Sequence, residues 1–190
     1  MASEQVGLAA LLVEKEGEDA AFALLPADHV IEDAKGFRAT LEAAFAASEA
    51  EDVLVTIGIK PDFPSTGYGY LCRGDELKVE EGRVLSRVDR FVEKPDLPKA
   101  KEYLKEGTYF WNAGMFVWRP GVILAEIDRL TPKLAHGLRE LKAMWTDSGD
   151  LEQAMAKIYP SLEKISIDFA VMEKAKDVVM LESAFDWDDV

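Results

Sequence analysis

Cysteine and long apolar runs are scarce in this sequence. Its one cysteine, Cys72, cannot form an internal disulfide, which fits a reducing compartment. No run of about 18 apolar residues occurs, and the first residues lack the pattern of a signal peptide. We therefore expect a soluble, cytoplasmic protein.

Positive charge is scarce as well. Lys and Arg number 22 against 36 Asp and Glu, which gives a net charge of -14. Nucleic acids and anionic membranes repel such a chain, so we expect neither as a partner. A bound phosphate would need a few local cations or a metal ion. The apolar fraction of 48% over 190 residues is ordinary for a globular protein, and we expect residues 1–190 to form a single domain.

Strand-like and helix-like patterns alternate in the first third of the chain. Residues 20–25 and 52–59 are short, continuous apolar runs, which are typical of strands buried on both faces. The Ala-rich segment 32–50 between them is amphipathic with a helical period. A strand, a helix and a strand at this spacing predict a βαβ unit with parallel strands.

The rest of the chain continues the alternation after a Pro- and Gly-containing loop over 60–70. We predict further strands at 76–80, 84–93, 109–118, 178–181 and 184–187. We predict further helices at 4–15, 97–106, 121–130, 133–145, 151–159 and 167–175. The first of these helices is expected to end at Gly17. Together these patterns indicate an α/β fold with a mixed sheet.

Asp28 follows the first predicted strand, which Pro26 ends because proline has no N–H to donate. Ligands of open α/β sheets bind at the carboxyl ends of the strands, so this carboxylate is a candidate metal or ligand contact. The alternative is that Asp28 caps the next helix or closes a turn. Its position alone does not decide between the two.

Glu93, Lys94 and Pro95 lie at the end of a predicted strand. Pro95 predicts an extended conformation for Lys94, and a lysine at a strand end can bind a phosphate as a point charge. The alternative is a solvated Glu93–Lys94 pair at a sheet edge, which contributes little to stability.

Asn112 interrupts the apolar strand at 109–118. A buried amide without hydrogen-bond partners costs about 1–3 kcal/mol, so Asn112 needs either protein partners or a hydroxyl-rich ligand. Gly114 would allow the backbone or a ligand to approach closely.

Three carboxylates, Asp186, Asp188 and Asp189, fall within four residues near the end of the sequence. They repel one another unless a cation neutralises them, and such hard oxygen ligands suit Mg²⁺. The alternative is a solvated acidic surface, although Phe185 and Trp187 argue against full exposure.

Six short motifs occur in order and together resemble the mannose-1-phosphate guanylyltransferase family, within the sugar-nucleotidyltransferase superfamily. They cover nearly the whole chain, from about Leu8 onward, and are Leu25-Pro26-Ala27-Asp28-His29, Gly67-Tyr68-Gly69-Tyr70, Phe91-Val92-Glu93-Lys94-Pro95, Trp111-Asn112-Ala113-Gly114-Met115-Phe116, Ile167-Asp168-Phe169-Ala170-Val171-Met172-Glu173-Lys174 and Phe185-Asp186-Trp187-Asp188-Asp189-Val190. The resemblance implies a Rossmann-like, three-layer nucleotidyltransferase fold with a mixed, mostly parallel sheet, here a partial domain truncated at its N-terminal strand.

The resemblance also implies a reaction. GTP and mannose 1-phosphate would give GDP-mannose and pyrophosphate, with Mg²⁺ held by Asp28 and Asp189. Because a phosphate oxygen is the nucleophile, catalysis would be mostly positioning and electrostatics, and no general base is needed. His29 and His136 are therefore expected to be structural.

Substrate contacts fall on the other motifs, at Gly69, Glu93, Lys94, Asn112, Asp168 and Asp186. By the family pattern, Glu93 and Asn112 would bind sugar hydroxyls, and Lys94 would bind the sugar phosphate as a third catalytic residue beside the two metal ligands. Gly69 would offer backbone contacts to the sugar. Asp168 and Asp186 lie in matching motifs without a firm role.

The family's glycine-rich phosphate loop has no counterpart in the sequence, because Gly7 and Gly17 are the only glycines before Asp28. The family's C-terminal β-helical segment is also missing. We therefore expect little activity from the chain alone, and an exposed sheet edge that favours a homo-oligomer or a partner strand. Two alternatives stay open: a uridylyl- or thymidylyltransferase acting on glucose 1-phosphate, and a non-catalytic sugar-phosphate-binding or regulatory module.

Overall fold

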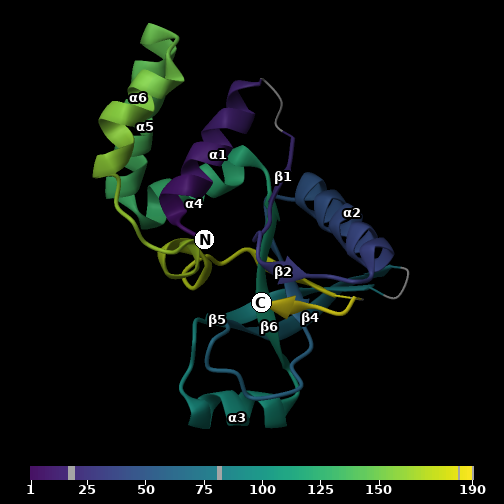
Figure 1. Ribbon diagram of the computed structural model, residues 1–190. Coiled ribbons are helices and arrows are strands. Elements are labelled where there is room, and N and C mark those ends of the chain that lie inside the picture. The colour runs from purple at the N-terminus through teal and green to yellow at the C-terminus, as the bar shows by residue number, and fades with distance from the viewer. Residues whose placement is uncertain (17–19, 81–82, 184, 190) are drawn as a thin grey trace. The chain divides into compact units, whose positions relative to one another are not determined.

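The computed structural model describes residues 1–16, 20–80, 83–183 and 185–189 (Figure 1). The chain divides into two compact units. Unit 1 comprises Met1–Ala20 and Arg119–Ala175, and unit 2 comprises Ala21–Trp118 and Lys176–Val190. Within the described ranges, no helix combines the length and apolar character that a membrane crossing requires.

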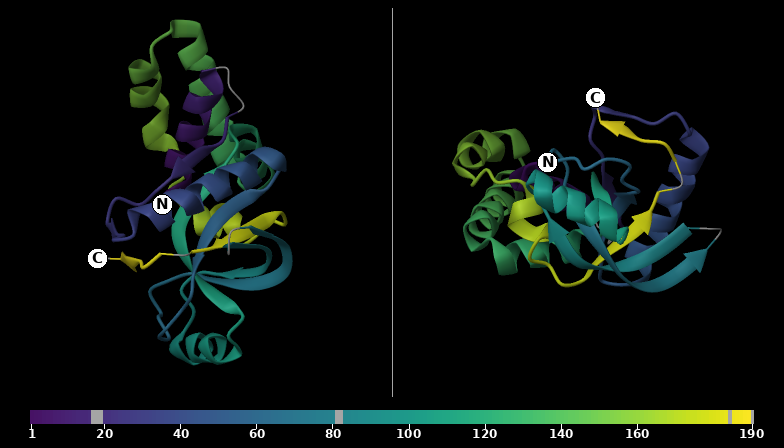
Figure 2. Two further views of the ribbon diagram at one scale, coloured as in Figure 1. Left: turned by 90° about the vertical axis from the view of Figure 1, so that its right-hand side faces the viewer. Right: turned by 90° about the horizontal axis from the view of Figure 1, so that it is seen from below.

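Unit 2 is built on a six-stranded sheet with the strand order β1-β6-β3-β7-β5-β4. Figure 2 shows strands of this sheet in blue to teal, and the C-terminal segment in yellow. Its strands are β1 (Phe22–Leu24), β3 (Leu54–Ile59), β4 (Tyr70–Glu80), β5 (Arg83–Val92), β6 (Tyr109–Trp118) and β7 (Val178–Glu182). The α/β class and the mixed sheet predicted from the sequence are confirmed. The strand β4 begins at Tyr70, earlier than its predicted start at residue 76.

The parallel share of this sheet is smaller than predicted. Among the described pairings β3 and β7 are parallel, and the others are antiparallel. The strands β1 and β3 do run in the same direction, as a βαβ unit requires, but both pair antiparallel with β6, which lies between them. The position of β6 between β1 and β3 depends on tertiary structure, which the periodicity of a local segment does not indicate.

Strand β6 is central to the sheet because it pairs with β1, β3 and β4, and it is buried along nearly its whole length. It pairs with β3 along one edge. Along the other edge, Leu24 of β1 lies opposite Phe116, and Tyr70 of β4 lies opposite Trp111. The end of β1 and the start of β4 therefore meet at the middle of β6. The β3–β6 register also shifts there, and Gly114 takes a left-handed φ of 66°.

Two helices belong to unit 2. Helix α2 (Ala34–Ala50) packs on β3, β6 and β7, with Ala44 fully buried. Helix α3 (Leu97–Glu106) starts at the cap Asp96 and ends at Gly107, whose φ of 72° is left-handed. Both ends of α3 match the prediction, because acidic N-caps and left-handed glycines are strong local signals.

A second, two-stranded sheet consists of β2 (His29–Val30) and β8 (Asp188–Asp189). The strand predicted at 184–187 is not observed: residue 184 lies outside the described residues, and Phe185–Trp187 are not in a strand. Instead Phe185 is buried against Phe37 of α2, with ring centroids 5.5 Å apart. This anchor leaves the next residues to extend and pair with β2.

Unit 1 is helical, with α1 (Ser3–Lys15), α4 (Pro120–Leu130), α5 (Pro132–Ser148), α6 (Leu151–Ile158), the 3₁₀ turn η1 (Tyr159–Ser161) and the π-helical turn η2 (Asp168–Met172). A Cβ on Gly7 of α1 would clash with the side chain of Leu138 of α5, so the two helices pack closely at this glycine. The predicted helices are confirmed, but the last is shorter than 167–175. The predicted stop at Gly17 lies outside the described residues.

Candidate active site

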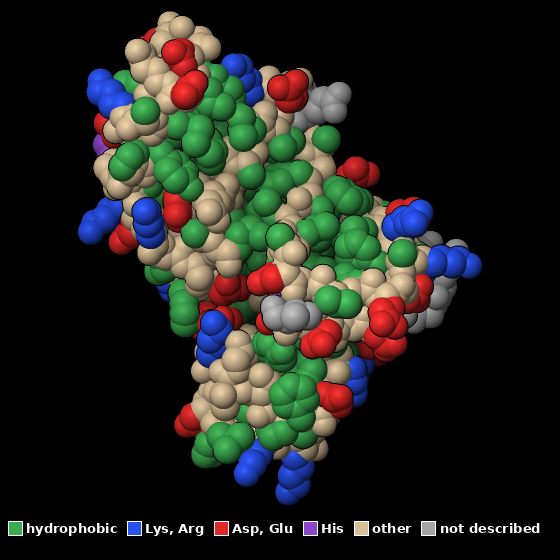
Figure 3. Space-filling model, viewed as in Figure 1, with side chains coloured by type: hydrophobic (Ala, Val, Ile, Leu, Met, Phe, Trp, Pro, Cys, Tyr) green, Lys and Arg blue, Asp and Glu red, His purple; other side chains and the backbone are tan. Residues whose placement is uncertain are grey.

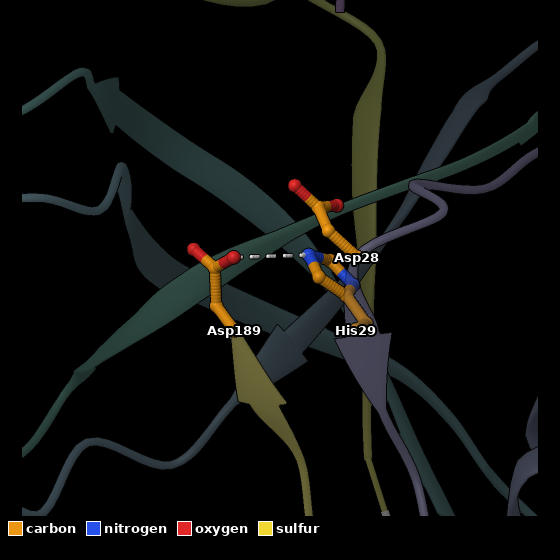
Figure 4. Close-up of side chains that lie close together, drawn as sticks. All are labelled: Asp28, His29 and Asp189. Carbon is orange, nitrogen blue, oxygen red and sulfur yellow. Dashed lines mark ion pairs between the residues drawn. The ribbon is translucent and has the colours of Figure 1, made fainter.

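The ladder between β2 and β8 brings Asp28 to Asp189. In this antiparallel pairing His29 lies opposite Asp189 and Val30 lies opposite Asp188. Asp28 immediately precedes β2, and one potential ligand atom from each of Asp28, His29 and Asp189 lies within 4.8 Å of the others (Figure 4). Both carboxylates are exposed. Figure 3 shows several acidic side chains, in red, on this face of the molecule. The two predicted metal ligands thus converge.

The capping alternative for Asp28 does not hold for the next helix. The N-cap of α2 is Asp33, whose Oδ1 accepts hydrogen bonds from the backbone N–H groups of Lys35 and Gly36 at 3.1 and 2.9 Å. Asp28 lies well before this cap, so its carboxylate remains with the β2–β8 ladder.

The His29 ring is held on two sides. Its side chain is 8% exposed, and Nδ1 accepts a hydrogen bond from the indole Nε1–H of Trp187 at 3.1 Å. The two rings pack edge to face, with centroids 5.1 Å apart. Burial lowers the pKa of His29 below its usual value, although Asp189 and Asp28 act in the opposite direction. The ring is therefore predominantly neutral near neutral pH.

The acidic pair fits a hard divalent cation. Mg²⁺ takes oxygen ligands at about 2.0–2.1 Å, so two ligands on opposite sides of one ion lie about 4.2 Å apart. The carboxylates of Asp28 and Asp189 need only a small side-chain movement to reach that spacing. Because both are exposed, the remaining positions around an ion would be open to water and phosphate oxygens.

Gly69, Glu93 and Asn112 form a second group. The carbonyl oxygen of Gly69 accepts a hydrogen bond from the backbone N–H of Asn112 at 2.8 Å. A Cβ on Gly69 would lie 2.6 Å from Oε2 of Glu93 and 3.4 Å from Cβ of Asn112. A side chain at this position would displace the Glu93 carboxylate, and the three residues predicted to bind the sugar lie side by side.

The Asn112 amide is oriented by the protein. Its Oδ1 accepts hydrogen bonds from the Thr56 hydroxyl at 2.8 Å and from the Gly114 backbone N–H at 3.2 Å. From the sequence alone, the partner of the Asn112 amide could be either the protein or a hydroxyl-rich ligand. The structure shows that its carbonyl oxygen is bound by the protein. Thr56 was missed by sequence reasoning, although a hydroxyl within the apolar run 52–59 could have indicated a buried polar contact.

Lys94 departs from its predicted backbone conformation. Its φ is 46°, and among the described residues no other non-glycine residue has a positive φ. The chain turns sharply here, because β5 ends at Val92 and the cap of α3 follows at Asp96. The ammonium group is exposed, and its Nζ lies 3.8 Å from Oε1 of Glu93. Strained residues of this kind concentrate at functional sites.

An aromatic cluster of Tyr68, Trp111 and Trp187 joins the two groups of the site. The Tyr68 ring centroid lies 5.2 Å from that of Trp111 and 5.2 Å from that of Trp187. Tyr68 and Trp111 adjoin the Gly69 group in sequence, and Trp187 contacts His29. Burial raises the pKa of Tyr68, and the negative charges of Asp189 and Asp188 raise it further. No pattern in the sequence indicated that these three rings meet.

Two of the predicted site residues, Asp186 and Asp168, are not members of these groups. Asp186 is exposed and is not among the acidic residues that cluster with Asp28 in the described part of the chain. Asp168 is buried at the start of η2 in unit 1. Neither belongs to the two groups of unit 2 described above.

Comparison with known proteins places the chain in a family. The family described as nucleotidyl transferase matches residues 4–190. The chain belongs to this family. The nucleotidyl transferase family generally uses a divalent metal and binds nucleoside triphosphates and sugar phosphates. The acidic pair of Asp28, directly before β2, and Asp189 on β8 is the candidate site for such a metal.

Individual proteins of known name resemble the chain over almost its full length. Xanthan biosynthesis protein XanB of Xanthomonas campestris pv. campestris (strain B100) is 39% identical over 97% of the chain and 38% of its own length. The mannose-1-phosphate guanylyltransferase of Escherichia coli (strain K12) is 38% identical over 97% of the chain and 39% of its own length.

A solved structure agrees with the fold. The crystal structure of a Thermus thermophilus protein described as a mannose-1-phosphate geranyltransferase superposes with a TM-score of 0.83 at 36% identity. The alignment covers 99% of the chain and 51% of that protein. The chain therefore spans between about two fifths and half of the length of these relatives.

Proposed function

We propose that this chain serves the transfer of a guanylyl group from GTP to mannose 1-phosphate, which yields GDP-mannose and pyrophosphate. The observation that carries the proposal is the convergence of Asp28 and Asp189, which the aromatic cluster connects to the group formed by Gly69, Glu93 and Asn112. The relatives named mannose-1-phosphate guanylyltransferase support the choice of nucleotide and sugar.

The acidic pair has the metal role in this proposal. Asp28 and Asp189 would hold Mg²⁺, which when bound neutralises charge on the phosphates. Lys94 would bind the phosphate of mannose 1-phosphate, because its ammonium group is exposed and lies 3.8 Å from the Glu93 carboxylate of the Gly69 group. Asp168 and Asp186 receive no ligand contact in the proposal.

The Gly69 group would bind the sugar. The Glu93 carboxylate can accept hydrogen bonds from hydroxyls, and the Asn112 amide is fixed by Thr56 so that it meets the sugar without reorganisation. Gly69 lets the sugar approach the backbone, since it carries no side chain. The attacking phosphate oxygen is already ionised, so His29 need not act as a base.

Calorimetric titration of the chain with mannose 1-phosphate and with glucose 1-phosphate, each with and without Mg²⁺, tests the sugar and metal parts of the proposal. We expect Mg²⁺-dependent binding that favours mannose 1-phosphate. Preference for glucose 1-phosphate would support the uridylyl- or thymidylyltransferase alternative. Binding that is indifferent to Mg²⁺ would support the non-catalytic module.

Pyrophosphate release with GTP, UTP and dTTP tests the nucleotide. We expect the signal of the chain to be largest with GTP. A larger signal with UTP or dTTP would contradict the assignment of GTP.

A further inference from the structure

His29 lies within reach of the acidic pair, yet the proposed reaction gives it no chemical task. We propose that His29 is a positioning residue that orients Asp189 for a divalent cation and is not itself a metal ligand, with Trp187 fixing the orientation of the ring. The inference rests on the proposed metal site. It makes Asp28 and Asp189 the metal ligands and His29 the residue that positions Asp189.

The hydrogen bond from Trp187 determines which ring nitrogen of His29 carries the proton. An indole N–H can only donate, so the lone pair of Nδ1 must accept it at 3.1 Å. A neutral imidazole has one N–H, which must then be on Nε2. A metal ligand needs a free lone pair, and Nε2 in this state has none to offer.

The Nε2–H of His29 faces the carboxylate of Asp189. These residues lie directly opposite each other in the β2–β8 ladder, where opposing side chains share one face. Nε2 lies 3.9 Å from Oδ1 of Asp189, so the contact is electrostatic at this distance and longer than a hydrogen bond (Figure 4). One side of the Asp189 carboxylate is thereby held, while Asp28 approaches the same group of atoms.

The rigidity of the ring makes this contact effective. His29 is almost buried, whereas Asp189 has 37% of its side chain exposed. An exposed carboxylate gains order from a fixed partner, and such partners of metal ligands typically change metal affinity by about 10–100-fold when removed. The edge-to-face packing of Trp187 adds to the hydrogen bond in holding the ring.

Two substitutions separate the two ring nitrogens. His29→Gln can place an N–H donor near the position of Nε2 and so keeps the contact with Asp189. His29→Asn can place an oxygen near the position of Nδ1 and so keeps the acceptor for Trp187 but loses the donor. His136→Gln is the matched control, because His136 is the only other histidine and its side chain is 70% exposed in unit 1.

The Mn²⁺ affinity of the 190-residue chain and of each variant is measured by titration, with electron paramagnetic resonance reporting the concentration of free Mn²⁺. We expect His29→Asn to weaken Mn²⁺ binding by about 10-fold or more, His29→Gln to weaken it clearly less, and His136→Gln to leave it nearly unchanged. Equal losses of Mn²⁺ affinity in His29→Gln and His29→Asn would overturn the inference, because a residue needed only for folding would be affected equally by both substitutions. Thermal unfolding of each variant confirms that it is folded.

The same samples test whether the imidazole touches the ion. If His29 does not bind the ion, electron spin echo modulation of Mn²⁺ bound to the wild-type chain should lack the coupling that a directly ligated ¹⁴N produces. At about pH 8, where imidazoles are neutral, ¹⁵N correlation spectra should place the His29 proton on Nε2. Coupling to a ligated ¹⁴N, or a proton on Nδ1, would overturn the inference.

These outcomes are separable from those of the proposed function. Mn²⁺ binding and the proton position are measured without nucleotide or sugar, so they can hold even if GTP or mannose 1-phosphate is the wrong substrate. If the wild-type chain binds no Mn²⁺, the metal site itself is refuted and the inference with it.

Discussion

His29 and Asp189 lie opposite each other in a ladder of two residues per strand, although one is near the start of the sequence and the other near its end. The pairing positions Asp28 as well, since it directly precedes β2. The acidic pair therefore depends on a short backbone interaction, reinforced by the Trp187–His29 hydrogen bond and by Phe185 packed on Phe37. Substitutions that leave these anchors in place can probe the chemistry of the site without unfolding it.

The absence of a side chain at Gly69 is needed for the position of Glu93. In Gly69→Ala the new Cβ would lie 2.6 Å from Oε2 of Glu93 and must displace it. We expect a stability loss of about 1–3 kcal/mol and a decrease of about 10-fold in affinity for mannose 1-phosphate. Calorimetry and urea unfolding measure the two effects.

Gly67→Ala is the control in the same loop. A Cβ there meets only the Ser65 hydroxyl at an ordinary 3.6 Å, so affinity and stability should stay close to those of the wild type. If both alanine variants bind mannose 1-phosphate as the wild type does, Glu93 does not contribute to the sugar site.

The Thr56 hydroxyl is expected to stabilise the buried Asn112 amide. Thr56→Val keeps the shape of the side chain but removes a donor at 2.8 Å from Oδ1 of Asn112. Because both residues are buried, we expect the free energy of unfolding to fall by about 1–3 kcal/mol in urea titrations.

Thr40→Val is a matched control for this change. Thr40 is equally buried, but its hydroxyl donates to the backbone carbonyl of Gly36, which keeps its helical hydrogen bond. The loss should be below about 1 kcal/mol. Equal losses at Thr56 and Thr40 would mean that the Asn112 contact has no special weight.

Lys94 is expected to supply the cation for the sugar phosphate. In a chain with a net charge of -14, removing an exposed lysine at the site should weaken phosphate binding by about 10-fold, and added salt should reduce the difference. Calorimetry of Lys94→Ala with mannose 1-phosphate measures this. Lys99→Ala should bind normally, because Lys99 already pairs with Glu102 at 2.9 Å on α3. A normal affinity in Lys94→Ala would remove Lys94 from the phosphate site.

The parts of the fold that follow local rules could be predicted from the sequence. The bounds of β6 and α3 agree with the prediction, since one is a continuous apolar run and the other has an acidic cap and a terminal glycine. The candidate residues Gly69, Glu93 and Asn112 could be named from their motifs, but their mutual contact depends on how β4 and β5 approach β6.

The parts that depend on tertiary structure could not be predicted. A two-residue strand such as β2 has no periodicity, so its pairing with β8 left no pattern in the sequence. The left-handed φ of Lys94 overrides the usual preference of a residue before proline, because the turn between β5 and α3 is set by its two ends. The Thr56–Asn112 contact joins two strands that are far apart in the chain.

The convergence of Asp28 and Asp189 on one cation is tested most directly by Mg²⁺-dependent binding of mannose 1-phosphate to Asp28→Asn, Asp189→Asn and the control Asp188→Asn. Asp188 adjoins Asp189 on β8 and is equally exposed, but neighbouring side chains of a strand point to opposite faces. We predict that the first two variants lose the Mg²⁺ dependence and that Asp188→Asn keeps it. Retention of the Mg²⁺ dependence in both Asp28→Asn and Asp189→Asn would contradict the account.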